Sequence, residues 1–262
     1  MKTIRRLATI LICAVAVLSF CQRTSYDRQF REHPNAPLSK QFPLGTDELG
    51  RDRFSRLLYG TRISLLAAPA AALLSTVLAA LIGGLAGFLG GWTDRAATAA
   101  IDLMLSLPWI FLLIIVRALL PLNVPPILSI VVTFGLIGLL GWPSAARIVR
   151  AGCIAIRGSD MLIQARACGL REGRVLLKHV VPAVRPILVA QFRASIPIYI
   201  LAEANLGLLG LGVTDPLPSW GNLLRPLESC LVRDAAAWAP LALMLVVVSC
   251  FYLTQSSEVV VR

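Results

Sequence analysis

Six long apolar runs alternate with shorter polar segments along the chain. A helix that crosses the hydrocarbon core of a bilayer needs about 20 mostly apolar residues, so each run can be compared with that length. The runs cover residues 7–20, 63–91, 96–116, 127–142, 186–212 and 235–257. This pattern predicts an all-α integral membrane protein with about six transmembrane helices.

The first run is the shortest, and it follows Lys2, Arg5 and Arg6 as the core of a signal peptide would. Cleavage requires small residues before the cut, and bulky Phe20 stands in such a place. We therefore expect an uncleaved first helix. The chain then divides into an N-terminal helix with an external segment, residues 1–62, and a five-helix core, residues 63–262.

The composition supports a location in the lipid bilayer. Hydrophobic residues make up 57% of the chain and charged residues 15%, whereas soluble domains contain about 25% charged residues. The net charge of +11 would suit a nucleic acid only if Lys and Arg formed one continuous basic patch, and they lie between the apolar runs instead. We therefore attribute the excess of Lys and Arg to the orientation of the chain in the membrane, and we expect no nucleic-acid partner.

The most basic segment lies between the fourth and fifth runs, at about residues 143–185. Its basic residues are Arg147, Arg150, Arg157, Arg166, Arg171, Arg174, Lys178 and Arg185. By the positive-inside rule this loop is cytoplasmic. Six crossings then place both termini on the cytoplasmic side of the membrane. An external position for residues 21–62 runs against the same rule, because that segment is also rich in Lys and Arg.

Side chains that could carry chemistry are few. The cysteines form no CxxC pair, and neither His33 nor His179 has a second ligand at metal spacing, so we expect no metal site. The sequence contains no GxxxxGK[ST] phosphate loop, so the chain should not bind or hydrolyse ATP itself. A hydrolase within the membrane would need a nucleophile with a base at membrane depth, which the apolar runs do not offer.

The basic loop contains the stretch GSDMLIQARACGLREGRVLLKHVVPAVRP, residues 158–186. It predicts two short helices separated by Gly169, which suits a turn with positive φ. Ser159 or Asp160 can cap the first helix, and Pro182 should close the second before the next span. Apolar and basic residues fall near helical spacing here, so the element should lie on lipid headgroups or dock into a partner's groove.

This stretch resembles the coupling loop of permease subunits of ATP-binding-cassette importers. The family's pattern has Glu-Ala-Ala, then a glycine, and ten residues later a histidine followed by x-x-Pro. The residues within the matching segment are Ala165, Arg166, Ala167, Gly169, His179 and Pro182. One position departs from the pattern: Ile163 stands where the family has Glu, which usually helps to anchor the loop. The sequence leaves open whether this change weakens coupling.

Two further stretches carry the same resemblance. PLGTDELGRDRFSRLLYGTRISL, residues 43–65, and AEANLGLLGLGVTDPLPSWGNLL, residues 202–224, resemble signatures of the second permease subunit of oligopeptide, dipeptide and nickel importers. Together with the coupling loop they span most of the chain from residue 43 onward. The resemblance implies the type I ABC importer permease fold with a cytoplasmic coupling helix.

The first of these stretches reads as a folded turn on the external face. Gly45 and Gly50 permit tight backbone geometry, and Thr46 and Asp47 can cap the turn that follows. Asp52 is close enough in sequence to pair with Arg51 or Arg56. Two interpretations stay open, a structural clamp and a contact with the protein that delivers the cargo.

The second stretch contains a proline-rich segment between the last two spans. We expect Pro216, Pro218, Ser219, Trp220 and Gly221 to form a rigid external turn with the indole at the membrane interface. The resemblance implies that this loop dips toward the pathway, and simple packing is the alternative.

Three charged residues fall at membrane depth, namely Asp102, Arg193 and Glu203. A lone charge there costs roughly 2.5–3.5 kcal/mol, so each should face protein or water. We expect Glu203 to anchor another helix rather than to bind a peptide amine. Asp102 and Arg193 should lie near the cytoplasmic interface.

The resemblance implies a permease that forms half of a translocation pathway for peptides or related solutes, including nickel chelates. Its implied partners are a homologous permease subunit, two ATP-binding subunits that hold ATP and magnesium, an extracytoplasmic substrate-binding protein and the lipid bilayer. This chain itself should carry no cofactor. The alternative is an ion-coupled secondary carrier that works without ATPase partners.

Overall fold

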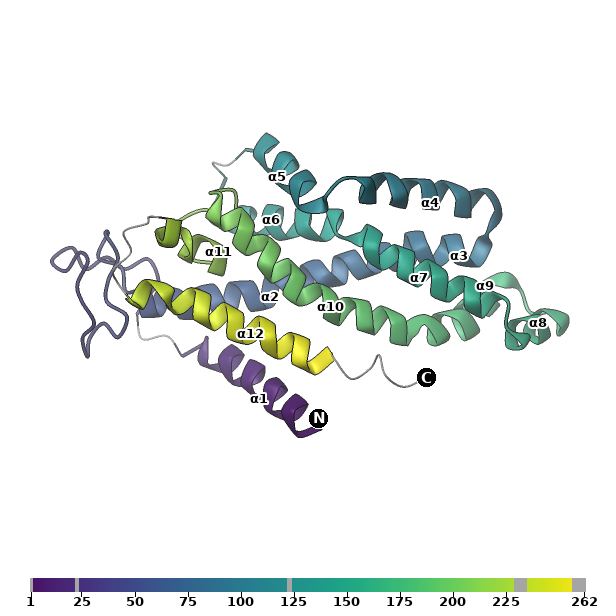
Figure 1. Ribbon diagram of the computed structural model, residues 1–262, viewed down its shortest axis with the longest axis horizontal. Coiled ribbons are helices and arrows are strands. Elements are labelled where there is room, and N and C mark those ends of the chain that lie inside the picture. The colour runs from purple at the N-terminus through teal and green to yellow at the C-terminus, as the bar shows by residue number, and fades with distance from the viewer. Residues whose placement is uncertain (1, 22–23, 122–123, 229–234, 256–262) are drawn as a thin grey trace.

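The computed structural model describes residues 2–21, 24–121, 124–228 and 235–255. These residues form an elongated helical bundle (Figure 1). The helices are α1 Lys2–Leu18, α2 Arg53–Ala79, α3 Leu85–Leu89, α4 Gly91–Ser106, α5 Trp109–Leu119, α6 Pro126–Leu140, α7 Trp142–Arg157, α8 Asp160–Ala167, α9 Glu172–Val175, α10 Val181–Leu208, α11 Trp220–Leu223 and α12 Ala239–Gln255. Within the described ranges no β-strand is present beyond isolated bridges in the segment before α2.

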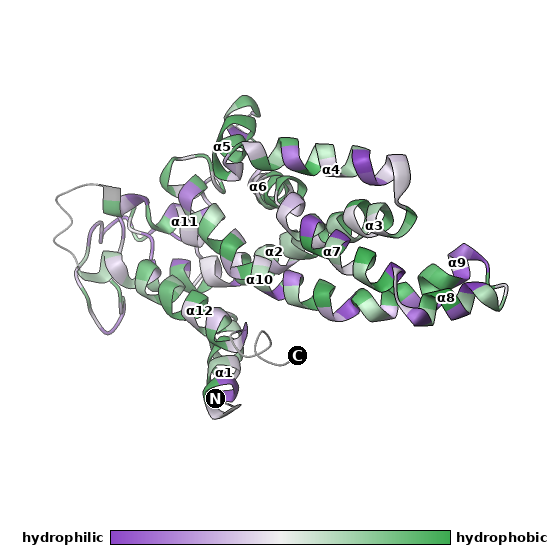
Figure 2. Ribbon diagram, turned by 45° about the vertical axis from the view of Figure 1, so that its right-hand side comes forward, coloured by the Kyte–Doolittle hydropathy of each residue, from purple (hydrophilic) through white to green (hydrophobic). Residues whose placement is uncertain are grey.

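Four helical stretches are long and apolar enough to cross a membrane, by length and composition. They are Arg53–Leu89, Pro126–Arg157, Glu172–Leu208 and Ala235–Gln255. Their hydrophobic residues make up much of the bundle in Figure 2. The first apolar run forms α1, which is 17 residues long and packs along α12.

The third run forms a broken span. Helices α4 and α5 meet at an angle of 83°, and the pair counts as a fifth candidate span if it is taken together. The break lies at Leu107, whose backbone is extended (ψ 137°), directly before Pro108. A proline disfavours the α-helical conformation of the residue before it, so the sequence itself places the bend.

Three spans are longer than their apolar runs. The second begins at Arg53, the fourth continues to Arg157 and the fifth begins at Glu172. The loop expected at about residues 143–185 is therefore much shorter, because most of its basic residues lie on helices. The expectation that Pro182 closes a helix is wrong, since Pro182 lies in the first turn of α10, where a proline is tolerated. A π-helical turn, Leu176–Val180, joins α9 to α10.

Glycines in the π-helical turn Ala80–Gly84 and in α3 let this part of the chain approach α7. A Cβ atom on Gly83 would lie 2.3 Å from the carbonyl oxygen of Ala146, and one on Gly87 would lie 2.6 Å from that of Arg150. These glycines thus serve packing within the chain.

Different segments of the chain form the two ends of the bundle. The segment before α2 and the segment around α11 lie at one end, and α8 and α9 lie at the other (Figure 1). Helix α1 starts, and α12 ends, on the side toward α8 and α9. The start of α1 and the end of α12 therefore lie on the same side of the bundle.

We predict that Gly83→Ala destabilises the chain by about 1–3 kcal/mol, because the new methyl group overlaps backbone that cannot move without separating α2 from α7. Thermal unfolding of the purified chain in detergent measures this. The matched control is Gly135→Ala in α6, where a Cβ meets nothing within 4 Å. An equal response of the two variants would contradict the prediction.

Candidate functional site

The turn before α2 is built on two glycines. Gly45 and Gly50 have φ angles of 70° and 72°. A Cβ atom on them would lie 2.4 Å from the Ala36 carbonyl oxygen and 2.3 Å from that of Phe30. Both conditions require glycine, which confirms the tight geometry expected at these positions.

Thr46 and Asp47 fix the polar groups of this turn. Thr46 is fully buried, and its hydroxyl accepts from the Ala36 amide at 2.8 Å and donates to the His33 carbonyl. Asp47 Oδ1 accepts from the amides of Leu49 and Arg51 at 3.0 and 2.8 Å. The capping role is confirmed for Asp47, whereas the Thr46 hydroxyl bonds the preceding segment and does not cap the turn that follows.

Asp52 has a different role from the one expected. It is the N-cap of α2, and its carboxylate accepts from the amides of Phe54 and Ser55, both at 3.2 Å. The Ser55 hydroxyl donates to it at 2.6 Å. The expected ion pair with Arg51 or Arg56 is wrong, because the free amides at the start of a helix take this carboxylate.

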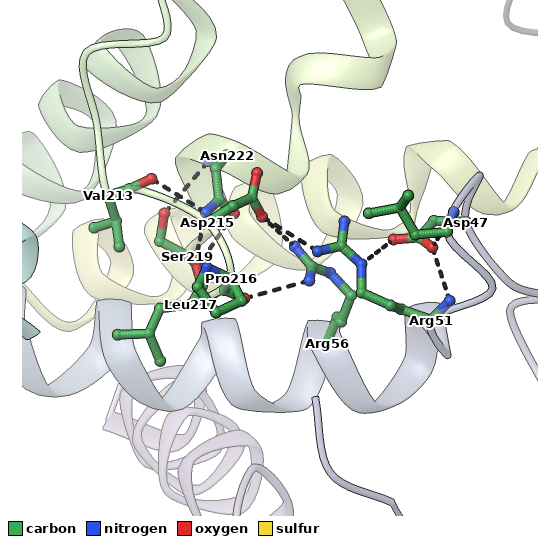
Figure 3. A network of polar contacts seen from close by, with 10 residues as sticks. Asp47, Arg51, Arg56, Val213, Asp215, Pro216, Leu217, Ser219 and Asn222 are labelled. Carbon is green, nitrogen blue, oxygen red and sulfur yellow. Dashed lines mark hydrogen bonds and ion pairs between the residues drawn. The ribbon is translucent and has the colours of Figure 1, made fainter. Parts of the chain in front are cut away.

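The two arginines reach a distant acid instead. Arg51 Nε lies 2.6 Å from Asp47 Oδ2, and Arg51 Nη1 lies 3.5 Å from Asp215 Oδ1. Arg56 Nη2 lies 3.1 Å from the same Asp215 oxygen. Figure 3 shows both guanidinium groups turned toward Asp215. We call these four residues, Asp47, Arg51, Arg56 and Asp215, the clamp.

The loop that carries Asp215 is held by Asn222. The Asn222 side-chain amide donates to the carbonyls of Leu217 and Val213 at 2.7 and 3.3 Å (Figure 3). Its carbonyl oxygen accepts from the Ser219 amide at 2.9 Å, and the Ser219 hydroxyl accepts from the Asn222 amide, which completes a capping box at α11. Pro218 lies within this closed loop, between Leu217 and Ser219.

Glu203 joins this loop to α10. Its carboxylate is fully buried and accepts from the Ser219 hydroxyl at 2.6 Å and from the Gly221 amide at 3.1 Å. A Cβ atom on Gly221 would lie 2.5 Å from Glu203 Oε1, so only glycine fits there. These contacts agree with the anchoring role expected for Glu203, and the partners are neutral donors of α11 rather than a cation.

Trp220 is not at the membrane interface, contrary to expectation. Its side chain is fully buried, and the indole N–H donates to the Thr61 hydroxyl at 3.0 Å. The Trp220 amide donates to the Ser64 hydroxyl at 3.2 Å. A buried indole needs a partner for its N–H, and α2 supplies it.

At the opposite end, α8 and α9 form a hairpin around Gly169, whose φ of 76° confirms the expected turn. Arg166 bonds Glu172 through Nε at 2.9 Å and Nη2 at 3.2 Å, which ties the two helices together. The guanidinium also lies 5.9 Å from the ring centre of Phe88 in α3. Ser159 occupies the N-cap position of α8, but its hydroxyl makes no capping bond.

The hairpin presents one buried and one exposed face. Leu162 and Ala165 are buried, whereas Ile163 and Leu177 are 57% and 69% exposed. Ala167 also lies on the exposed side, and His179 is half-buried on the π-helical turn. Ile163, which stands where the importer pattern has Glu, is thus free to contact another molecule.

Acids of α4 pair with arginines of α7. Asp102 lies 2.5 Å from Arg147, and Asp94 forms two bonds with Arg150 at 2.5 and 2.8 Å. Arg193 donates to the Thr254 carbonyl at 3.4 Å. In the part of the chain that the structure describes, no group of three or more His, Cys, Asp or Glu could hold a metal ion.

Sequence reasoning missed Asp215 and Asn222. Asp215 stands 159 residues from Arg56, and no spacing rule links them. Asn222 carries a weak signal, because Ser219 with an amide three residues later is a capping-box pattern.

Comparison with known proteins gives a consistent picture. Residues 79–256 match the family described as binding-protein-dependent transport system inner membrane component. A putative peptide permease protein of Brucella suis is 36% identical over 204 residues, which cover 78% of this chain and 65% of that protein. The dipeptide transport system permease protein DppC of Bacillus subtilis is 32% identical over 81% of this chain and 65% of its own length.

The match to a third relative is longer. The oligopeptide transport system permease protein OppC of Haemophilus influenzae is 31% identical over 94% of this chain and 75% of its own length. The aligned part of the chain thus spans about two thirds of the length of the first two relatives and three quarters of the third.

We predict that Glu203→Leu lowers the free energy of unfolding by about 2–4 kcal/mol, because two buried donors lose their acceptor. Glu203→Gln keeps one acceptor oxygen and should lose less. Thermal unfolding and protease sensitivity of the loop around α11 measure the effect. Asn205→Leu, on the exposed side of the same helix, is the control and should change little. A Glu203→Leu chain as stable as the control would contradict the anchoring role.

We also predict that Arg56→Met and Asp215→Asn are coupled in a double-mutant cycle by about 1 kcal/mol, since each variant alone removes the same ion pair. The free energy of unfolding of the single and double variants measures the coupling. A second cycle of Arg31→Met with Asp215→Asn serves as the control, because Arg31 is exposed outside the clamp, and its effects should add. Additive effects in the first cycle would refute the clamp.

Proposed function

The chain belongs to the family of binding-protein-dependent transport system inner membrane components, and we propose that it forms half of the pathway of an ATP-binding-cassette importer for peptides. Its proposed partners are a homologous permease subunit, two ATP-binding subunits and an extracytoplasmic substrate-binding protein. ATP and magnesium belong to the ATP-binding subunits in this proposal. The proposed location is the bacterial inner membrane, with the α8–α9 hairpin and both termini in the cytoplasm.

The observation that carries the proposal is the position of the hairpin. It joins two of the long candidate spans, Pro126–Arg157 and Glu172–Leu208, at the end of the bundle. A force applied there acts directly on both helices. Closure of the ATP-binding subunits would therefore tilt the spans between inward-open and outward-open states as rigid bodies.

The peptide cargo is proposed from the relatives' names. Those names refer to peptides, dipeptides, oligopeptides and, in a protein of Pectobacterium atrosepticum, glutathione. A nickel chelate would be carried without protein ligands, since chelated metal needs none from this chain.

The residues that the structure describes do not favour an ion-coupled carrier. Such a carrier needs membrane-depth carboxylates that are open to an ion. The Glu203 carboxylate accepts hydrogen bonds from Ser219 and Gly221. Asp94 and Asp102 form ion pairs with arginines of α7.

The test begins with purification of the tagged chain from its native membrane and an ATPase assay in lipid. Recovery of two ATP-binding subunits and a second permease supports the proposal, and a chain that purifies alone without ATPase activity refutes it.

We predict that Arg166→Ala lowers transport-linked ATPase activity about fivefold, because the hairpin loses its ion pair with Glu172. His179→Ala should also uncouple, whereas Arg31→Ala at the opposite end is the control and should leave the activity unchanged.

A further inference from the structure

A cavity of about 540 Å³ lies beside the clamp. Its walls come from the turn before α2, the loop that holds Asp215, and the start of α12. Small-molecule sites in proteins typically enclose about 300–1,000 Å³, so this cavity is large enough for a short peptide. Apolar side chains, among them Leu44, Leu57 and Leu223, form part of the wall.

Some charged side chains of the wall are paired within the protein, and others are not. The charged residues are Asp47, Glu48, Arg51, Arg53, Arg56, Asp215 and Arg225. The clamp uses two acids and two arginines, whose charges cancel, and Arg53 has a partner of its own.

Glu48 and Arg225 remain. Both are exposed, and neither forms a hydrogen bond or an ion pair with any residue in the ranges that the structure describes. The cavity wall thus offers one carboxylate and one guanidinium that the fold does not use.

A ligand that satisfies both groups must carry a cation and an anion. A simple anion would pair with Arg225 but be repelled by Glu48, and a simple cation would pair with Glu48 but be repelled by Arg225. A short peptide with free ends carries an amine and a carboxylate separated by an uncharged backbone. A guanidinium binds a carboxylate through two parallel hydrogen bonds, which suits Arg225 to the C-terminal end.

We propose that this cavity holds a short zwitterionic peptide by its two ends, with Glu48 at the amine and Arg225 at the carboxylate. The proposal rests on the proposed function and specifies where the cargo meets the membrane subunit after delivery. The neighbouring clamp keeps its own ion pairs and forms another part of the same wall.

The test uses the complex purified through the tagged chain, in lipid nanodiscs without binding protein. Calorimetry measures the binding of trialanine with free ends, of its N-acetylated form and of its C-amidated form. Glu48→Gln should weaken binding of the free and amidated peptides about fivefold and leave the acetylated peptide unchanged. Arg225→Gln should weaken binding of the free and acetylated peptides by a similar factor and leave the amidated peptide unchanged.

Two exposed residues of the same segment provide matched controls. Glu32→Gln and Arg31→Gln remove the same charges outside the cavity wall and should not change binding of any of the peptides. The proposal is overturned if trialanine does not bind at millimolar concentration, or if a cavity variant affects the three peptides equally.

These outcomes separate the two proposals. If the complex lacks ATPase activity, the proposed importer function is refuted. If the complex hydrolyses ATP in response to its binding protein but shows no end-specific peptide binding, only the proposed cavity site is refuted.

Discussion

The buried carboxylate of Glu203 is the contact on which one whole end of the bundle depends. The chain leaves α10 at Leu208 and folds back against it through α11, away from water. Backbone amides in such a place must find partners within the protein. Glu203 provides an acceptor for Gly221 and Ser219, and α2 provides another for Trp220. These bonds let a short, interrupted segment lie inside a bundle of long helices.

The position of α11 decides what the clamp can do. The capping box of α11 and the two backbone bonds from Asn222 fix the loop around Asp215. Arg51 and Arg56 then connect that loop to the start of α2. The segment before α2 is thereby fastened to α10, whose helical stretch begins at Glu172 in the hairpin. A single chain of contacts thus runs from one end of the molecule to the other.

Local rules predicted the parts of the fold that depend on neighbours in sequence. Apolar runs became helices, Gly45, Gly50 and Gly169 took positive φ, and Asp47 capped its own turn. The helix limits were less predictable, because hydropathy does not count ion pairs between helices. Arg150 stays within a span since Asp94 of α4 meets it, and this contact has no local signature.

The same reason explains the errors at the candidate site. Trp220 could be buried because Thr61, far away in sequence, accepts its N–H. Asp52 is the exception, because its cap on α2 is a local contact that the N-cap preference for Asp could have indicated. The clamp itself required the tertiary fold to bring Asp215 to Arg56. Sequence reasoning located both motifs, but it did not show that they meet.

We expect the hairpin and the clamp to move as one rigid unit, because α10 connects them. The most direct measurement is the distance between spin labels on Cys168 in the hairpin and on Leu49→Cys beside the clamp, in the purified complex with the other cysteines replaced. A rigid unit gives the same distance distribution with and without ATP, because it moves as a whole. A shift of several ångströms within the chain on ATP binding would contradict it.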